Sequence, residues 1–217
     1  MKPWLANLLF PPKCHFCRAV LSGDEIDLCN SCRDTAPEFS KAKRNISLIA
    51  QWTAVWYYKG DVRQSIHSFK FANARRYADV YARQMAVAII QAGFADSFDC
   101  ISWVPISFLR YLKRGYNQSA LMAKALSKEL GVPTQRLLKK VRHTPAQSGI
   151  QGGAQRKANI ANAYIAINTE NIRGRKVLLV DDVLTTGATV SECAKTLATA
   201  GVSKLYFVAV ATSEKNK

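Results

Sequence analysis

The segment from residue 177 to residue 189, V-L-L-V-D-D-V-L-T-T-G-A-T, constrains the fold more than any other part of this chain. Four consecutive apolar residues, Val177 to Val180, predict a strand that is buried on both faces. Two acids follow, then a loop of threonines and glycine, and then an expected helix from Ala188 to Ala200. Because ligands of open α/β sheets bind outside the carboxyl ends of the strands, this order predicts where a site lies.

The loop in this segment has the chemistry of a phosphate cradle. Thr185 to Thr189 would present backbone N–H groups, hydroxyls and a helix N-terminus to an anion. Asp181 and Asp182 would accept hydrogen bonds from vicinal sugar hydroxyls, a combination that suits a ribose 5-phosphate. The alternative is an ordinary helix N-cap after a strand, where acids and threonines are also favoured.

The rest of the chain alternates between strand and helix patterns. Because nearly continuous apolar strands alternate with helices, we expect an α/β fold with a mostly parallel sheet covered on both faces. Strands are expected at 53–58, 99–104, 136–141, 163–167, 176–180 and 204–211, and helices at 61–71, 76–91, 117–130 and 188–200.

Four cysteines near the N-terminus have the spacing of a metal site, C-x2-C-x11-C-x2-C. Two Cys-x-x-Cys turns direct four sulfurs at one centre, which predicts a structural Zn²⁺ site with no open position. Two disulfides are the competing interpretation, and a reducing compartment argues against them. His15 lies inside the first turn and is a possible substitute ligand, whereas Cys100 and Cys193 are expected in the core. The predicted ligands are Cys14, Cys17, Cys29 and Cys32.

These patterns divide the chain into two expected domains. Residues 1–45 would form the zinc-binding domain with an apolar N-terminal arm, and residues 46–217 the α/β domain. The apolar run at residues 4–10 ends in two prolines without a cleavage site, so we interpret it as a packing arm and not a signal peptide. No apolar run is long enough to cross a bilayer, and we expect a cytoplasmic protein.

Several motifs together give the chain a family resemblance. Besides residues 177–189 and the four cysteines, they are Y-Y-K-G at 57–60, F-K-F at 69–71, V-P at 104–105, R-G-Y-N-Q at 114–118, T-P-A-Q at 144–147, and Arg156 with Asn159. Residues 177–189 resemble the 5-phosphoribosyl-1-pyrophosphate (PRPP) motif of type I phosphoribosyltransferases. The whole set resembles the competence protein F (ComF) family over essentially the entire chain.

The resemblance implies roles for individual residues. Asp181 and Asp182 would hold the ribose hydroxyls of PRPP, and the segment 185–189 (Thr185, Thr186, Gly187, Ala188 and Thr189) would hold its 5-phosphate. The loop after Val104 would bind pyrophosphate through Arg110, Lys113 and Arg114, and Arg114 would act with the two acids in the chemistry. Residues 142–157 would form a mobile loop that closes over the site. Mg²⁺ would be held largely by PRPP and water.

Positive charge is concentrated next to this expected site. The chain has a formal net charge of +16, and residues 110–157 carry +10 of it with Glu129 as their single acid. A pyrophosphate pocket needs only a few of these cations, so the surplus favours a nucleic-acid path over a merely solvated basic face. Aromatic side chains could stack on nucleic-acid bases, and the candidates are Trp52, Trp56, Tyr57 and Tyr58. Aromatic residues in a strand are, however, more often part of the core. The candidate nucleic-acid residues are Lys124, Lys128, Lys139, Lys140 and Arg142, with Arg136 nearby.

Two functions of different classes remain open at this point. The resemblance implies a PRPP-binding protein that handles incoming single-stranded DNA in natural transformation, with a competence helicase or other uptake protein as a possible partner. The alternative is an active phosphoribosyltransferase that transfers ribose 5-phosphate from PRPP to an unidentified nitrogenous base. We find no acceptor-binding hood in the sequence, which weighs against the second function.

Overall fold

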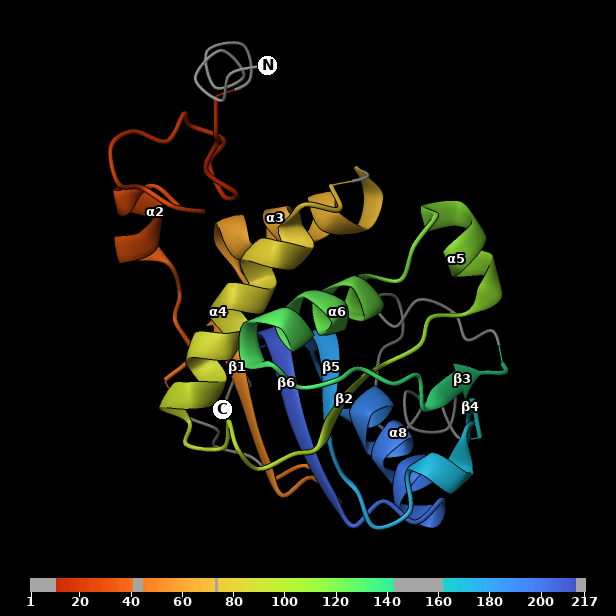
Figure 1. Ribbon diagram of the computed structural model, residues 1–217. Helices are drawn as coiled ribbons and strands as arrows, with labels where there is room; N and C mark the ends of the chain where they lie inside the picture. The colour runs from red at the N-terminus through yellow and green to blue at the C-terminus, as the bar shows by residue number, and fades with distance from the viewer. Residues whose placement is uncertain (1–10, 41–44, 73, 143–161, 214–217) are drawn as a thin grey trace.

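A four-stranded parallel sheet forms the centre of the protein. The computed structural model describes residues 11–40, 45–72, 74–142 and 162–213 (Figure 1). The strands lie in the order β1-β6-β5-β2, and every neighbouring pair is parallel. The expected α/β class is confirmed. The strands are β1 (Gln51–Tyr57), β2 (Cys100–Trp103), β5 (Lys176–Leu184) and β6 (Lys204–Thr212).

Helices cover both faces of this sheet, as the apolar strands require. On one face α4 (Tyr77–Gln91) and α6 (Gln118–Leu130) lie side by side, preceded in the chain by α3 (Gly60–Phe71) (Figure 1). On the other face lies α8 (Ala188–Thr199). Successive side chains of β5 therefore enter different cores. Leu178 and Val180 pack with α4 and α6, whereas Val177 and Leu179 pack with α8. A 3₁₀ turn (Thr169–Asn171) precedes β5.

Strand β5 is longer than the sequence predicts. The expected end was Val180, but the strand continues to Leu184 and includes both acids. The reason is the neighbouring strand β6, which stays paired with it from Lys176↔Lys204 to Leu184↔Thr212. Continuous pairing with an apolar partner outweighs the low strand propensity of aspartate. The two carboxylates are thus fixed by a sheet and not by a loop.

Two other segments depart from expectation. The stretch after Val104, expected as a loop, contains the short helix α5 (Phe108–Arg114), which ends at Gly115 with φ 74°. The expected strands at 136–141 and 163–167 shorten to β3 (Leu138–Lys140) and β4 (Tyr164–Ala166). These two strands form a separate antiparallel pair beside α8 and do not join the parallel sheet.

The four-cysteine region, which contains the short helix α2 (Asn30–Thr35), packs directly on α4. The Arg83 guanidinium donates two hydrogen bonds to the Asp27 carboxylate, at 2.9 and 2.6 Å. The Tyr77 hydroxyl donates to the carbonyl of His15 at 3.2 Å, and the two rings meet edge to face. The expected boundary at residue 45 is thus crossed by polar and aromatic contacts. Within the described ranges, no helix combines the length and apolar character needed for a membrane span.

Candidate functional site

Asp181 and Asp182 lie side by side near the carboxyl end of β5. The Ser119 hydroxyl, from the first turn of α6, donates to Asp181 Oδ1 at 2.9 Å. The same oxygen accepts from the backbone N–H of Asp182 at 2.9 Å. Burial, and after it the charge of Asp182, raises the pKa of Asp181 to about 7. Asp181 is therefore a carboxyl group close to half-ionised at neutral pH.

Asp182 forms an ion pair that sequence analysis missed. Lys70 Nζ lies 2.9 Å from Asp182 Oδ2, and the two side chains are only 20% and 14% exposed. Lys70 belongs to the last turn of α3, next to Phe69, which is fully buried. The F-K-F motif contains this lysine, but the motif alone does not indicate an ion pair. Nothing local in the sequence identifies that partner, which lies 112 residues away.

The loop after β5 has the form expected for a phosphate cradle. Gly187 is the N-cap of α8 and has φ 83°, a left-handed conformation that glycine adopts without strain. The Thr186 hydroxyl accepts from the Ala188 N–H at 3.4 Å, and the Thr185 carbonyl accepts from the Ser213 hydroxyl at 3.3 Å. The N-terminus of a twelve-residue helix thus opens next to the two carboxylates.

Basic side chains also reach this site from helix α5. Arg114, at the end of α5, is half-buried and donates from Nη1 to Gln118 Oε1 at 3.0 Å. Burial lowers the pKa of Arg114, and Asp182 is close enough to oppose that shift. Arg110, one turn earlier in α5, lies close enough to Arg114 and Lys140 to disfavour their charge. The structure therefore brings Arg110 and Arg114 together with the acids.

Lys140 is partly buried, unlike the other lysines predicted to bind nucleic acid. Its ammonium lies over the Tyr164 ring at 5.1 Å, and burial, with Arg110 contributing, lowers the pKa of Lys140 to about 8. Asp181 is also near enough to act on this group. The cause is the antiparallel pairing of β3 with β4, which turns this lysine inward while its neighbour Lys139 points outward. Between residues 110 and 142, the exposed cations are Lys113, Lys124, Lys128, Arg136, Lys139 and Arg142.

Packing resolves one further sequence interpretation, the role of the tryptophans of β1. Trp52 and Trp56 of β1 are buried, so they are core residues and not stacking surfaces. The expected mobile loop lies almost entirely outside the described residues, which resume at Asn162. His67 is exposed and its ring contacts Phe71.

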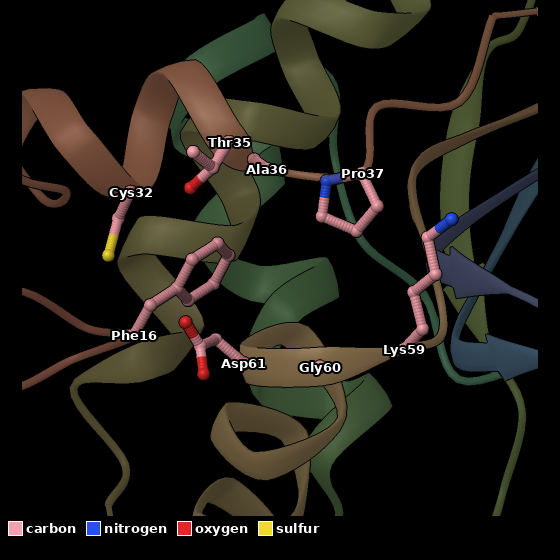
Figure 2. Close-up of a pocket in the computed structure, with 8 residues that line it drawn as sticks. All are labelled: Phe16, Cys32, Thr35, Ala36, Pro37, Lys59, Gly60 and Asp61. Carbon is pink, nitrogen blue, oxygen red and sulfur yellow. The ribbon is translucent and has the colours of Figure 1, made fainter.

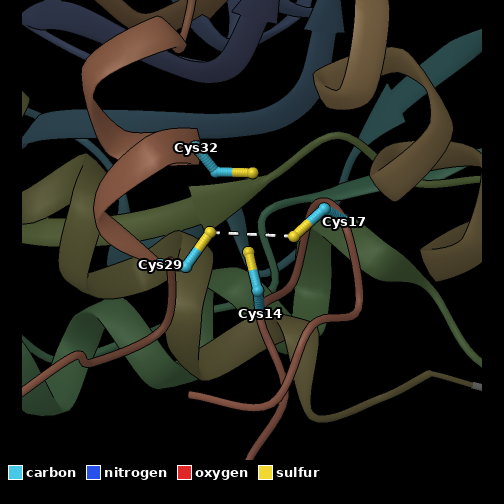
Figure 3. A group of neighbouring side chains, drawn as sticks. All are labelled: Cys14, Cys17, Cys29 and Cys32. Carbon is cyan, nitrogen blue, oxygen red and sulfur yellow. Dashed lines mark hydrogen bonds between the residues drawn. The ribbon is translucent and has the colours of Figure 1, made fainter. Parts of the chain in front are cut away.

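The four cysteines converge as a metal site requires (Figure 3). Their sulfurs all lie within 4.8 Å of one another, and Cys17 Sγ is 3.7 Å from Cys29 Sγ. Sulfurs at about 2.3 Å from a tetrahedral Zn²⁺ are about 3.8 Å apart, so the residues fit the ion. Burial opposes ionisation of Cys14, but N–H groups of Cys29, Cys17 and Phe16 outweigh it and lower the pKa of Cys14 to about 7. His15 is not part of the cluster, because its Nδ1 bonds the Asp27 carbonyl at 2.9 Å.

A cavity of about 330 Å³ lies at the junction between the cysteine region and α3 (Figure 2). It is lined by Phe16, Cys32, Thr35, Ala36, Pro37, Lys59, Gly60 and Asp61. Asp61 and Lys70 are nine residues apart in one helix, so this cavity is roughly 14 Å from the acid site along α3. This cavity is therefore distinct from the place where the charged groups converge.

Comparison with known proteins agrees with this geometry. The phosphoribosyl transferase domain model matches residues 117–217, and the double zinc ribbon domain model matches residues 5–43. A solved structure, adenine phosphoribosyltransferase from Thermoanaerobacter pseudethanolicus, is 18% identical with a TM-score of 0.39 and covers 70% of this chain and 84% of that one. The parallel α/β fold and the two domain matches together define a protein of the phosphoribosyltransferase type that carries a four-cysteine zinc ribbon.

Relatives narrow this class to one family. Competence protein F of Haemophilus influenzae is 30% identical over 182 residues, which cover 82% of this chain and 75% of that protein. Competence protein ComFC of Bacillus subtilis is 24% identical over 89% of this chain and 82% of its own length. The DNA utilization protein YhgH of Escherichia coli is 32% identical over 61% of this chain and 59% of its own length. The chain belongs to the competence protein F family.

Proposed function

We propose that this protein serves DNA uptake in natural transformation, where it handles incoming single-stranded DNA and binds PRPP with Mg²⁺ at the Asp181–Asp182 site. The names of its relatives, competence protein F and DNA utilization protein, support the role in DNA uptake. The match of residues 117–217 to the phosphoribosyl transferase domain supports PRPP as the small ligand. A competence helicase or another uptake protein would be its partner.

The observation that carries the PRPP proposal is the convergence of separate elements on one pair of acids. Strand β5 supplies Asp181 and Asp182 for the ribose hydroxyls, and the N-terminus of α8 supplies residues 185–189 for the 5-phosphate. Helix α5 directs Arg114, with Arg110 near it, toward the same place. These guanidiniums suit pyrophosphate because they bind phosphate oxygens in pairs.

The chain's own contribution to this site is charge and orientation. Mg²⁺, when bound, would neutralise part of the pyrophosphate charge and keep mainly phosphate and water ligands. Ser119 and the Asp182 N–H fix the Asp181 carboxyl, so that its second oxygen can accept from a sugar hydroxyl. Arg114 is held by Gln118, which reduces the conformational entropy it loses on meeting an anion.

Calorimetric titration with PRPP and Mg²⁺ tests this site. Asp182→Ala should lose most PRPP affinity, because it removes the acceptor for a ribose hydroxyl and leaves Lys70 without its partner. Asp96→Ala, which removes an exposed acid after α4, should bind as the unaltered protein does. Zinc content and thermal unfolding of both variants would show that the fold is intact. Full PRPP affinity in Asp182→Ala would refute the assignment.

The β3–β4 pair favours a second candidate function, transfer of ribose 5-phosphate to a nitrogenous base. Lys140 and Tyr164 from this pair are near enough to Asp181 for its charge to act on both side chains, and an acceptor base would need such polar groups. Pyrophosphate release from PRPP should then require a particular base. Assays with a panel of purines and pyrimidines distinguish the two functions. If the protein binds PRPP but no base triggers pyrophosphate release, only the DNA-handling function is supported.

A further inference from the structure

Helix α5 exposes an apolar surface that the functions above do not use. None of its seven residues is buried. Four large side chains are exposed: Phe108 by 71%, Leu112 by 62%, Leu109 by 58% and Tyr111 by 49%. We call these four residues the α5 platform. Single exposed apolar residues are ordinary, but four within five positions form a patch of the kind that marks an interaction site.

The orientation of the helix explains this exposure. Arg110 and Arg114 are four residues apart and therefore share one side of α5, which faces the acid site. Phe108 and Leu112, also four residues apart, project on the opposite side. A surface helix normally buries its apolar face and exposes its charges. In helix α5 the large apolar residues are exposed and the two arginines face the acid site. The helix stands apart from the sheet (Figure 1).

The charge of this helix limits what can cover the platform. It carries Arg110, Lys113 and Arg114 and no acid, within a chain of net charge +16. A second copy of the same chain would meet this charge with more of the same sign. The occupant must therefore combine apolar faces with negative charge. Single-stranded DNA has both, because its bases are unpaired and its backbone carries a phosphate at every nucleotide.

We propose that the α5 platform binds single-stranded DNA by stacking bases on Phe108 and Tyr111. The two rings start three residues apart on the helix, a rise of about 4.5 Å, which suits successive bases of a strand. Exposed Lys113 would neutralise a phosphate beside them, and Lys124 and Lys128, exposed on α6, supply further cations for the strand. This inference rests on the proposed DNA-handling function and assigns it a base-contacting surface.

Fluorescence anisotropy with two labelled oligonucleotides tests the proposal. One is a fifteen-nucleotide thymidine strand, and the other is a strand of equal length whose sugars carry no bases. The double variant Phe108→Ala, Tyr111→Ala should bind the thymidine strand about ten- to hundredfold more weakly and the abasic strand unchanged. Ile90→Ala, which removes a 60% exposed apolar residue from α4, is the matched control and should change neither.

The outcomes separate this inference from the function on which it rests. If the unaltered protein binds neither strand at low salt, the DNA-handling function fails and the platform with it. If the protein binds both strands equally, or if the double variant weakens both alike, stacking on α5 is refuted while DNA binding stands. Sedimentation with vesicles containing phosphatidylglycerol supplies a further arm. Loss of vesicle binding in the double variant, with thymidine binding intact, would assign the platform to a lipid surface instead.

Discussion

Among the described carboxyl groups with a resolved pKa shift, Asp181 is the one whose protonation changes near neutral pH. Its pKa is raised to about 7 because burial and the adjacent Asp182 both disfavour its charge. A ribose hydroxyl donates best to an ionised carboxylate. The same group is therefore unfavourable for folding and useful for binding at neutral pH.

We expect PRPP affinity to rise with pH between about 6 and 8 as Asp181 ionises. Titration calorimetry across this range would measure the rise. Inorganic pyrophosphate is the control ligand, since it has ionising phosphates but no ribose hydroxyls. A pH profile for PRPP that parallels that of pyrophosphate would contradict the role of Asp181.

Asp181→Asn should make the protein more stable above pH 7 while it weakens PRPP binding. The folded pKa is raised, so the folded state holds the proton more tightly than the unfolded chain and loses stability as pH rises through about 7. An amide has no charge to bury, so the gain at pH 8 should be on the order of 1–2 kcal/mol and vanish near pH 4. Thermal unfolding at the two pH values measures this difference.

Lys70→Met should weaken PRPP binding by roughly tenfold. The variant removes a cation 2.9 Å from Asp182 and leaves the site more negative toward an anionic ligand. Lys70→Arg keeps the charge and should restore most of the affinity. Lys59→Met, at the exposed start of the same helix, is the matched control. Equal loss in Lys70→Met and Lys70→Arg would point to packing instead of charge.

At the scale of elements, the sequence predicts the helices that cover the sheet closely but not how far the strands extend. The apolar runs and the glycines at 93, 131 and 201 locate α4, α6 and α8 within a residue or two. Strand β5 outlasts its apolar run because its neighbour β6 keeps pairing with it, a contact between distant residues that no local pattern encodes. The two acids were predictable as a candidate site because they lie together in one local motif. Lys70 and Ser119 were not predictable, because only the packing of α3 and α6 brings them to the acids.

The docking of the zinc ribbon on α4 gives a prediction about metal retention. Arg83→Met should leave the Asp27 carboxylate, 9% exposed, without its partner and cost about 1–3 kcal/mol. Release of zinc to a chromogenic chelator should accelerate, because Asp27 also holds His15 through its carbonyl. Arg63→Met, an exposed arginine on α3, should behave like the unaltered protein. Unchanged release in Arg83→Met would show that this ion pair does not retain the metal.

At the scale of the whole molecule, which has a net charge of +16, basic side chains fall into two groups. Lys70, Arg110, Arg114 and Lys140 lie at the acid site, while a second set on α5, α6 and β3 is exposed. Composition alone predicted a polyanionic partner, and only the fold shows which cations remain accessible to one. The exposed set is what a long anion would meet.

Lys124→Ala with Lys128→Ala should reduce the salt dependence of binding to single-stranded DNA. Each lost phosphate contact lowers the slope of log K against log salt by about 0.7, so the double variant should lose up to about 1.4. Anisotropy at a series of salt concentrations measures the slope. The stacking variant at Phe108 and Tyr111 should keep its slope, and a slope unchanged by the lysine variant would remove α6 from the DNA path.

The zinc ribbon and the sheet also share one hydrophobic cluster, in which Cys14, Cys32 and Phe16 pack with Trp56, Tyr77 and Tyr81. Two regions that share a core cannot melt independently. Calorimetry should therefore record a single cooperative heat-absorption peak for the whole chain, and chelating the metal should shift that one peak downward. The ribbon is in this sense part of the scaffold that keeps α3 and α4 in place, and its four thiolates secure far more of the chain than the nineteen residues they span.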